Sequence, residues 1–134
     1  MTLYMLDTDV CASIMRVPSD PLIRRLHETP LERQSISAVT LAELLYGVEV
    51  SSKPARNRTA LDAFVKHVSV LDWTVGAAEH YGEIRAHLQK KGQMIGSNDL
   101  MIAAHARHAR ATLVTGNDRE FRRVPALKVE NWMA

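Results

Sequence analysis

An α/β fold, with a central parallel sheet flanked by helices on both sides, is predicted by two features of the 134-residue sequence. Short apolar segments of strand length alternate along the chain with longer segments of helical periodicity. This alternation is typical of parallel strands joined by helices that cover both faces of the sheet. No repeat and no Gly/Ser-rich linker interrupts it, so we expect residues 1–134 to form a single domain.

The expected strands are apolar or alternate between apolar and polar residues, and they lie at 3–6, 33–39, 69–73, 111–115 and 127–132. The expected helices have apolar residues on one face, and they lie at 19–28, 40–48, 53–68, 97–110 and in a long segment that runs through Ala78 and Leu88 to Gly92. Asp20 is the expected N-cap of the first of these helices, and Pro21 marks its start, because proline suits the first helical turn.

Composition narrows the class of protein. The chain is 46% hydrophobic and 24% charged, as in ordinary folded proteins. Its single cysteine, Cys11, excludes an internal disulfide and fits a reducing cytoplasm. No apolar run has the length of a membrane span, and the N-terminus has no signal-type segment. We therefore expect a cytoplasmic protein that neither spans a membrane nor is secreted.

Basic residues are concentrated late in a chain whose net charge is only +2. Such clusters attract phosphate backbones, although they also occur on ordinary solvated faces. The candidates for contact with nucleic acid are Arg110, Arg119, Arg122 and Arg123, together with Lys90 and Lys91.

Two aspartates, Asp7 and Asp9, directly follow the first predicted strand. Ligands of parallel sheets bind beyond the carboxyl ends of the strands. A carboxylate at such a place is costly unless a cation compensates it. Asp7 is either a helix cap or a ligand of a cation, and Asp9 either caps the helix or supports Asp7.

Glu43 and Asp99 also have two interpretations each. Thr40 and Glu43 match the capping-box pattern, which would make Glu43 a helix cap. The other interpretation is that Glu43 is a carboxylate of the site. Asp99 near a helix start suits the helix dipole. The small residues Ala103 and Ala106 on the face of Asp99 would let this helix approach the sheet closely and carry Asp99 inward.

The segment after the fourth strand adds Thr115, Asn117 and Asp118, which either form a turn or face a ligand. His105 and His108 lack the spacing of a zinc-binding pair, so a structural zinc site is not expected. Oxygen ligands of this kind favour a hard divalent cation such as Mg²⁺ or Mn²⁺. The residues alone thus indicate metal-dependent phosphoryl chemistry.

These candidates lie in four segments, in the order MLDTDV, ISAVTLAELLYGV, GSNDLMIAAHA and LVTGNDREFRRVPALKVENW. The four segments resemble, in the same order, the motifs of the PIN-domain family and in particular of the VapC toxins of bacterial toxin–antitoxin pairs. The resemblance covers nearly the whole chain and implies a PIN-like fold.

The resemblance implies an acidic metal site at Asp7, Glu43 and Asp99, so that Glu43 is a ligand instead of a cap. The fourth family position, often aspartate, falls on Asn117, with Asp118 beside it and Asp9 in support. The implied activity is a Mg²⁺-dependent endoribonuclease, with Mn²⁺ as a substitute, acting on tRNA and specifically on the anticodon stem-loop of initiator tRNA. The implied partners are a VapB-type antitoxin with an inhibitory C-terminal segment and a second copy of the chain, in a heterotetramer or larger assembly.

Two other functions remain open from the sequence. A non-catalytic module that binds RNA or a protein partner would keep the basic residues and leave the acidic site unused. A phosphatase of the haloacid dehalogenase type shares the strand-Asp-x-Asp opening. It would need a threonine or similar residue where this chain has Cys11, and a separate lysine motif.

Overall fold

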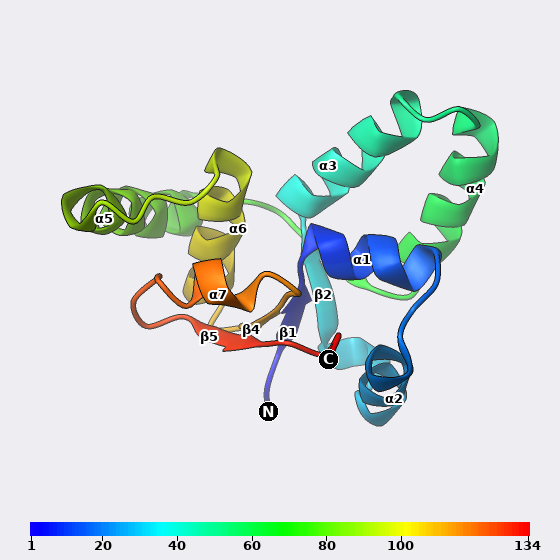
Figure 1. Ribbon diagram of the computed structural model, residues 1–134, viewed down its shortest axis with the longest axis horizontal. Coiled ribbons are helices and arrows are strands. Elements are labelled where there is room, and N and C mark those ends of the chain that lie inside the picture. The colour runs from blue at the N-terminus through cyan, green and yellow to red at the C-terminus, as the bar shows by residue number, and fades with distance from the viewer.

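Five short strands form one parallel sheet at the centre of the structure, a computed structural model that describes residues 1–134 (Figure 1). Their order across the sheet is β3-β2-β1-β4-β5, and every neighbouring pair is parallel. The strands are β1 (Tyr4–Leu6), β2 (Gln34–Ser37), β3 (Ser69–Leu71), β4 (Thr112–Val114) and β5 (Lys128–Glu130). The predicted parallel sheet with flanking helices is confirmed.

Seven α-helices connect the strands, and a 3-10 turn at Leu31–Arg33 precedes β2. They are α1 (Thr8–Met15), α2 (Asp20–Glu28), α3 (Ala38–Glu49), α4 (Pro54–Val65), α5 (Val75–Lys91), α6 (Ser97–His108) and α7 (Asp118–Phe121). In Figure 1, α5, α6 and α7 lie to one side of β1 and β2, and α1 to α4 lie to the other side. None of the helices has the length and apolar character needed to cross a membrane.

The two faces of the sheet carry separate apolar cores. Met5 of β1 and Leu113 of β4 are buried in the core beneath α5, α6 and α7. Their neighbours Leu6 and Val114 are buried in the core beneath α1 to α4. Successive strand residues point to opposite faces, so three-residue strands buried on both sides must be apolar throughout.

Helix starts differ from the sequence prediction at two places. Ser19, not Asp20, caps α2, since its hydroxyl accepts a hydrogen bond from the Leu22 backbone N–H at 3.3 Å. Ser37 caps α3 and accepts from the Val39 N–H at 3.1 Å, so this helix begins at Ala38. Thr40 therefore lies inside the helix, and the predicted capping box does not form.

The order in which the chain adds strands reverses between β1 and β4. The chain runs from β1 outward to β2 and β3, then returns to β4 on the other side of β1. In open parallel sheets such a reversal leaves a crevice at the carboxyl ends of the two strands, where ligands bind. Asp7 follows β1 and Thr115 follows β4 at this crevice.

Candidate functional site

Asp7 lies at the bottom of the crevice and is only 5% exposed. It is the N-cap of α1: its Oδ1 accepts from the Thr8 backbone N–H at 2.8 Å. Its Oδ2 accepts from the hydroxyl of Thr115, also at 2.8 Å. The cap and the site, which the sequence offers as alternatives, use different oxygens of the same carboxylate.

The Asp7 carboxylate has no cationic partner. No lysine, arginine or histidine forms an ion pair with it. Burial, together with the charge of Asp9, raises the pKa of Asp7 to about 7, although hydrogen bonds from Thr115 and Thr8 oppose the rise. A buried carboxylate in this state is stabilised by any cation that enters the crevice.

Asp9 joins α1 to the loop after β4. Its Oδ2 accepts from the Gly116 backbone N–H at 3.0 Å. A Cβ atom at Gly116 would lie 2.8 Å from the same oxygen, so a side chain there would push the two segments apart. Asp9 therefore holds the β4–α7 loop beside Asp7.

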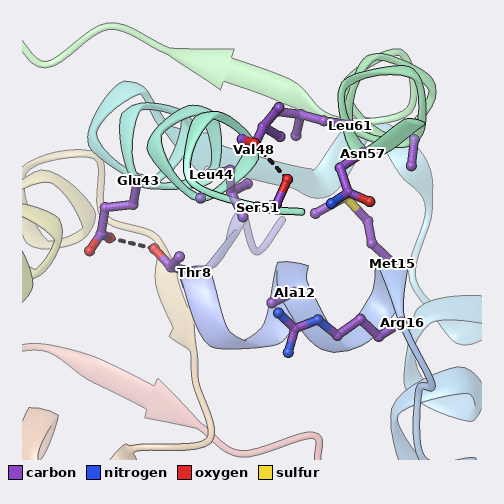
Figure 2. A pocket seen from close by; sticks show the side chains of 12 residues that line it. Thr8, Ala12, Met15, Arg16, Glu43, Leu44, Val48, Ser51, Asn57 and Leu61 are labelled. Carbon is purple, nitrogen blue, oxygen red and sulfur yellow. Dashed lines mark hydrogen bonds between the residues drawn. The ribbon is translucent and has the colours of Figure 1, made fainter. Parts of the chain in front are cut away.

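Glu43 approaches the crevice from α3. Its Oε1 accepts from the hydroxyl of Thr8 at 2.6 Å, and its Oε2 accepts from the Asn98 side chain at 3.1 Å. Figure 2 shows Glu43 turned toward Thr8 at the end of a hollow. Glu43 thus bonds to side chains of α1 and α6 and has no capping role in its own helix.

Asp99, in the first turn of α6, is half-buried. Burial raises its pKa, and the negative charges of Glu43, Glu120 and Asp9 add to the effect in that order. Ala103 and Ala106 behind it are fully buried, in agreement with the predicted close approach of α6 to the sheet. The structure therefore brings together carboxylates from α1, α3, α6 and α7.

Glu120 was not among the residues that the sequence singled out. It lies in the four-residue helix α7, and Asn117 is the N-cap of that helix. Residues three apart on a helix share a face, so the spacing from Asn117 to Glu120 was the available signal. Within α7, it is the charge of Glu120 that raises the pKa of Asp99.

The remaining residues of this segment have distinct places. Thr115 is fully buried and also accepts from the Asn117 backbone N–H at 2.9 Å. Asp118 accepts from the Asn131 side chain at 3.1 Å and from Arg122 at 3.4 Å. The Asn131 hydrogen bond is the main cause of a lowered pKa of Asp118. Its carboxylate is thus engaged by the C-terminal segment.

The basic candidates are divided between the amino ends and the carboxyl ends of the strands. Arg119, Arg122 and Arg123 lie in or directly after α7, beside Glu120, although Arg122 is paired with Asp118 and Arg123 donates to the Met94 carbonyl at 3.3 Å. Arg110 precedes β4, at the amino ends of the strands and so opposite the carboxylates. Its backbone φ is 56°. Contact of Arg110 with nucleic acid stays a prediction, at a place away from the carboxylates.

Two hollows meet at Glu43. One, of about 320 Å³, lies between α1, α3 and α4 and runs from Thr8 and Glu43 to Arg16 and Asn57 (Figure 2). The other, of about 480 Å³, lies toward α6 and is lined by Thr8, Val39, Ala42, Glu43, Tyr46 and Asn98. Among the acidic residues of the site, Glu43 lines both hollows and is open to solvent there.

The residues present fit a magnesium ion that keeps part of its water. No three histidine, cysteine, aspartate or glutamate side chains are close enough to enclose an ion without further ligands. Mg²⁺ does not need such a cage, because it retains several waters and uses one or two carboxylates plus substrate phosphate. Asp7 supplies a buried, uncompensated oxygen ligand of this kind.

Comparison with known proteins gives consistent results. The PIN domain family matches residues 4–127. Ribonuclease VapC2 of Rickettsia felis is 41% identical over 131 residues, covering 97% of this chain and 98% of the relative. The tRNA(fMet)-specific endonuclease VapC of Shigella flexneri is 42% identical over 133 residues, covering 98% and 99%. Nucleases of the PIN-domain family generally depend on a divalent metal ion.

Solved structures give the same result for the fold. A chain of VapBC2 from Rickettsia felis, bound to a DNA fragment from its promoter, has a TM-score of 0.93 and 40% identity, covering 98% of this chain and 99% of that one. A chain of DNA-bound VapBC from Salmonella typhimurium has a TM-score of 0.93 and 39% identity, with the same coverage. The resemblance seen in the four sequence motifs is confirmed.

Proposed function

The chain belongs to the PIN domain family and to its group of VapC ribonucleases, and from this premise we propose that it is the toxin of a toxin–antitoxin pair that hydrolyses RNA phosphodiesters. The observation that carries the proposal is the buried, uncompensated carboxylate of Asp7, on which the charges of Asp9 and Asp99 act. These groups lie at the crevice where a sheet of this topology binds its ligand.

We assign the divalent metal ion to Asp7, Glu43 and Asp99, which would hold it directly or through the waters that it retains, with Mg²⁺ as the natural ion and Mn²⁺ as a substitute. When bound there, the ion would stabilise negative charge on the phosphate oxygens and make water more nucleophilic. Thr115 orients Oδ2 of Asp7, and Thr8 and Asn98 orient the two oxygens of Glu43. Asp9 keeps the β4–α7 loop in place, and Glu120 supplies the negative charge that neutral Asn117 lacks.

The proposed substrate is tRNA, and specifically the anticodon stem-loop of initiator tRNA. The name of the Shigella flexneri relative, a tRNA(fMet)-specific endonuclease, supports this choice. Arg119, Arg122 and Arg123 beside Glu120 supply positive charge for the RNA backbone. The cytoplasm, where tRNA is found, is the proposed place of action.

The proposed partner is a VapB-type antitoxin, because the similar solved structures are VapBC complexes. The hollow between α1, α3 and α4 ends at Glu43, so a peptide segment seated in it would reach this carboxylate (Figure 2). We further propose that residues 1–134 act as one domain and pair with a second copy, giving a heterotetramer or larger complex with antitoxin. The match to the PIN domain family argues against the haloacid dehalogenase alternative.

The test is RNA cleavage by the purified chain. Initiator tRNA and an elongator tRNA are incubated with wild-type protein in Mg²⁺, in Mn²⁺ and in excess EDTA, and the products are mapped by primer extension. Asp7→Asn protein serves as the inactive control. We expect cleavage of initiator tRNA in the anticodon stem-loop with either metal and none in EDTA.

Two results would contradict the proposal. Cleavage that persists in EDTA, or that is equal for Asp7→Asn, would exclude the assigned metal site. RNA binding by the wild type without any cleavage would favour a non-catalytic binding module.

A further inference from the structure

His105 and Ser37 form a buried side-chain contact that joins α6 to α3. The Nδ1 atom of His105 lies 2.7 Å from the Ser37 hydroxyl oxygen. His105 is 3% exposed and Ser37 is fully buried. A polar pair inside an otherwise apolar interface must be matched in hydrogen bonding, so it permits few relative placements of the two helices.

The other hydrogen bond of Ser37 leaves its hydroxyl proton free to donate to His105. The Ser37 oxygen already accepts from the Val39 N–H at 3.1 Å, as the cap of α3. A serine hydroxyl has one proton to donate, and Nδ1 of His105 is the acceptor within reach. With Nδ1 as the acceptor of this proton, the ring is the neutral tautomer that carries its own proton on Nε2. Burial lowers the pKa of His105, as does the charge of His108, while Asp72 opposes them.

The two helices joined in this way carry the carboxylates that face each other across the crevice. Glu43 lies six residues after Ser37 on α3, and Asp99 lies six residues before His105 on α6. Six residues of helix span about 9 Å. At the far end of this span Asn98 donates to Glu43 at 3.1 Å. The helices are thus joined at two points, one buried and one at the surface.

We infer that His105 is a positioning residue for the metal site: by accepting the Ser37 hydroxyl, it fixes the placement of α6 against α3 and thereby the separation of Asp99 from Glu43. Asn98 limits only the exposed end of the same interface, where both side chains can adjust. The inference rests on the proposed function, because it assigns the purpose of the placement to metal binding.

The test compares two substitutions that differ in where they place an acceptor. In His105→Asn the amide oxygen stands the same number of bonds from Cα as Nδ1, so the Ser37 hydroxyl keeps its acceptor. In His105→Gln the amide lies one bond further out, near the former position of Nε2. Both side chains are polar and of moderate size, so a general cost of replacing the ring affects both. His108→Asn, at an exposed position on the same helix without a side-chain hydrogen bond, is the matched control.

Three quantities are measured: the Mn²⁺ dissociation constant by calorimetry without RNA, kcat and KM for tRNA cleavage, and the thermal unfolding midpoint. Loss of an outer partner of a metal site typically costs about 10–100-fold in affinity or activity. We expect His105→Gln to lose about 10-fold or more in both Mn²⁺ affinity and kcat, with KM little changed. His105→Asn should regain most of this loss, and His108→Asn should match the wild type. Nitrogen NMR of the wild type should show Nδ1 without a proton.

Equal Mn²⁺ affinity and kcat in the Asn and Gln variants, at a temperature where both are folded, would overturn the inference. A proton on Nδ1 of the wild type would do the same. If only the unfolding midpoint changes, His105 is a residue of the core and does not position the site. Failure of the wild type to bind Mn²⁺ or cleave RNA would overturn the proposed function and this inference together, whereas the other results overturn the inference alone.

Discussion

The strand side and the helix side of the carboxylate site are built differently. On the strand side, Asp7 and Asp9 are bonded to Thr115 and to the Gly116 backbone, and Asp7 is buried. On the helix side, Glu43 and Asp99 are partly exposed, and Glu43 bonds only to side chains.

Because of this difference, the stability of the fold and the activity depend on the same atoms on the strand side only. Asp7 caps α1 and accepts a hydrogen bond from Thr115, which follows β4. A substitution of Asp7 can therefore affect the start of α1, the contact with Thr115 and metal binding at once. Glu43 holds no backbone group in place, so its charge can be removed while the helix remains. Substitutions on the two sides should therefore separate stability from activity in different ways.

The largest effect is expected for Asp7→Asn. Activity should fall by more than the roughly 100-fold that outer partners of a metal site contribute, because Asp7 is assigned as a direct ligand. Asparagine keeps an oxygen for the Thr8 N–H, so α1 should retain its cap. Initial rates of tRNA cleavage measure the loss.

The same variant should change how stability depends on pH. The pKa of Asp7 is about 7 in the folded chain and about 4 when unfolded, so between these values the folded state holds the extra proton. Without metal, wild-type stability should therefore fall as pH rises from about 4 to about 7, by at most about 4 kcal/mol from this group. Asp7→Asn should remove that fall, and denaturant unfolding at several pH values measures it. An unfolded Asp7→Asn chain at pH 7 would show that its structural role dominates.

Next in size is Glu43→Gln on the helix side. Glutamine retains acceptors for Thr8 and loses the charge, so the free energy of unfolding should change by less than about 0.5 kcal/mol. Activity should nevertheless fall by about 100-fold if Glu43 is a ligand. Urea unfolding and cleavage rates, measured on one preparation, test both. Unchanged activity would leave Glu43 with a structural role and remove the distinction between the two sides.

A smaller effect should separate Glu120 from Asp118 in α7. Glu120→Gln removes a charge that raises the pKa of Asp99 and should weaken Mn²⁺ binding by about 10-fold. Asp118→Asn is the matched control, because its carboxylate faces Asn131 and Arg122. Calorimetry on both variants makes the comparison. Weaker binding in Asp118→Asn alone would assign the fourth charge to Asp118.

The smallest effect is expected for Arg119→Gln. This exposed arginine has no ionic partner in the structure, whereas Arg122 is paired with Asp118. If Arg119 contacts an RNA phosphate, its loss should reduce the slope of log K against log salt by about 0.7. Binding of RNA to Asp7→Asn protein, measured from low to moderate salt, gives the slope. Arg110→Gln should leave the slope unchanged, since Arg110 lies at the amino ends of the strands, away from the carboxylates.

The sheet and the places of Asp7 and Asp99 could be predicted because apolar pattern determines them. An apolar run that ends at Asp7 must place that residue at a strand end, and the buried Ala103 and Ala106 allow the close approach of α6. The role of Glu43 could not be derived from pattern. Its capping box depended on where α3 begins, and Ser37 is equally suited to end a strand or cap a helix.

The side-chain directions around Asp118 were also beyond sequence pattern. Helix α7 has only four residues, too few for periodicity to show which face is inward. Asp118 turns away because Asn131, thirteen residues later, provides a hydrogen bond. Contacts of this kind depend on the packing of the C-terminal segment, which no local signal in the sequence specifies.

The chain order of the site has a consequence for the cell that makes this protein. Asp7 receives its hydroxyl donor from Thr115, 108 residues later, and Asp9 receives the Gly116 N–H from a similar separation. A chain still on the ribosome and lacking these residues has its first carboxylates in place but neither their donors nor Glu120. The hydrogen bonds that hold Asp7 and Asp9 in the site are therefore made only after nearly all of residues 1–134 have been synthesised.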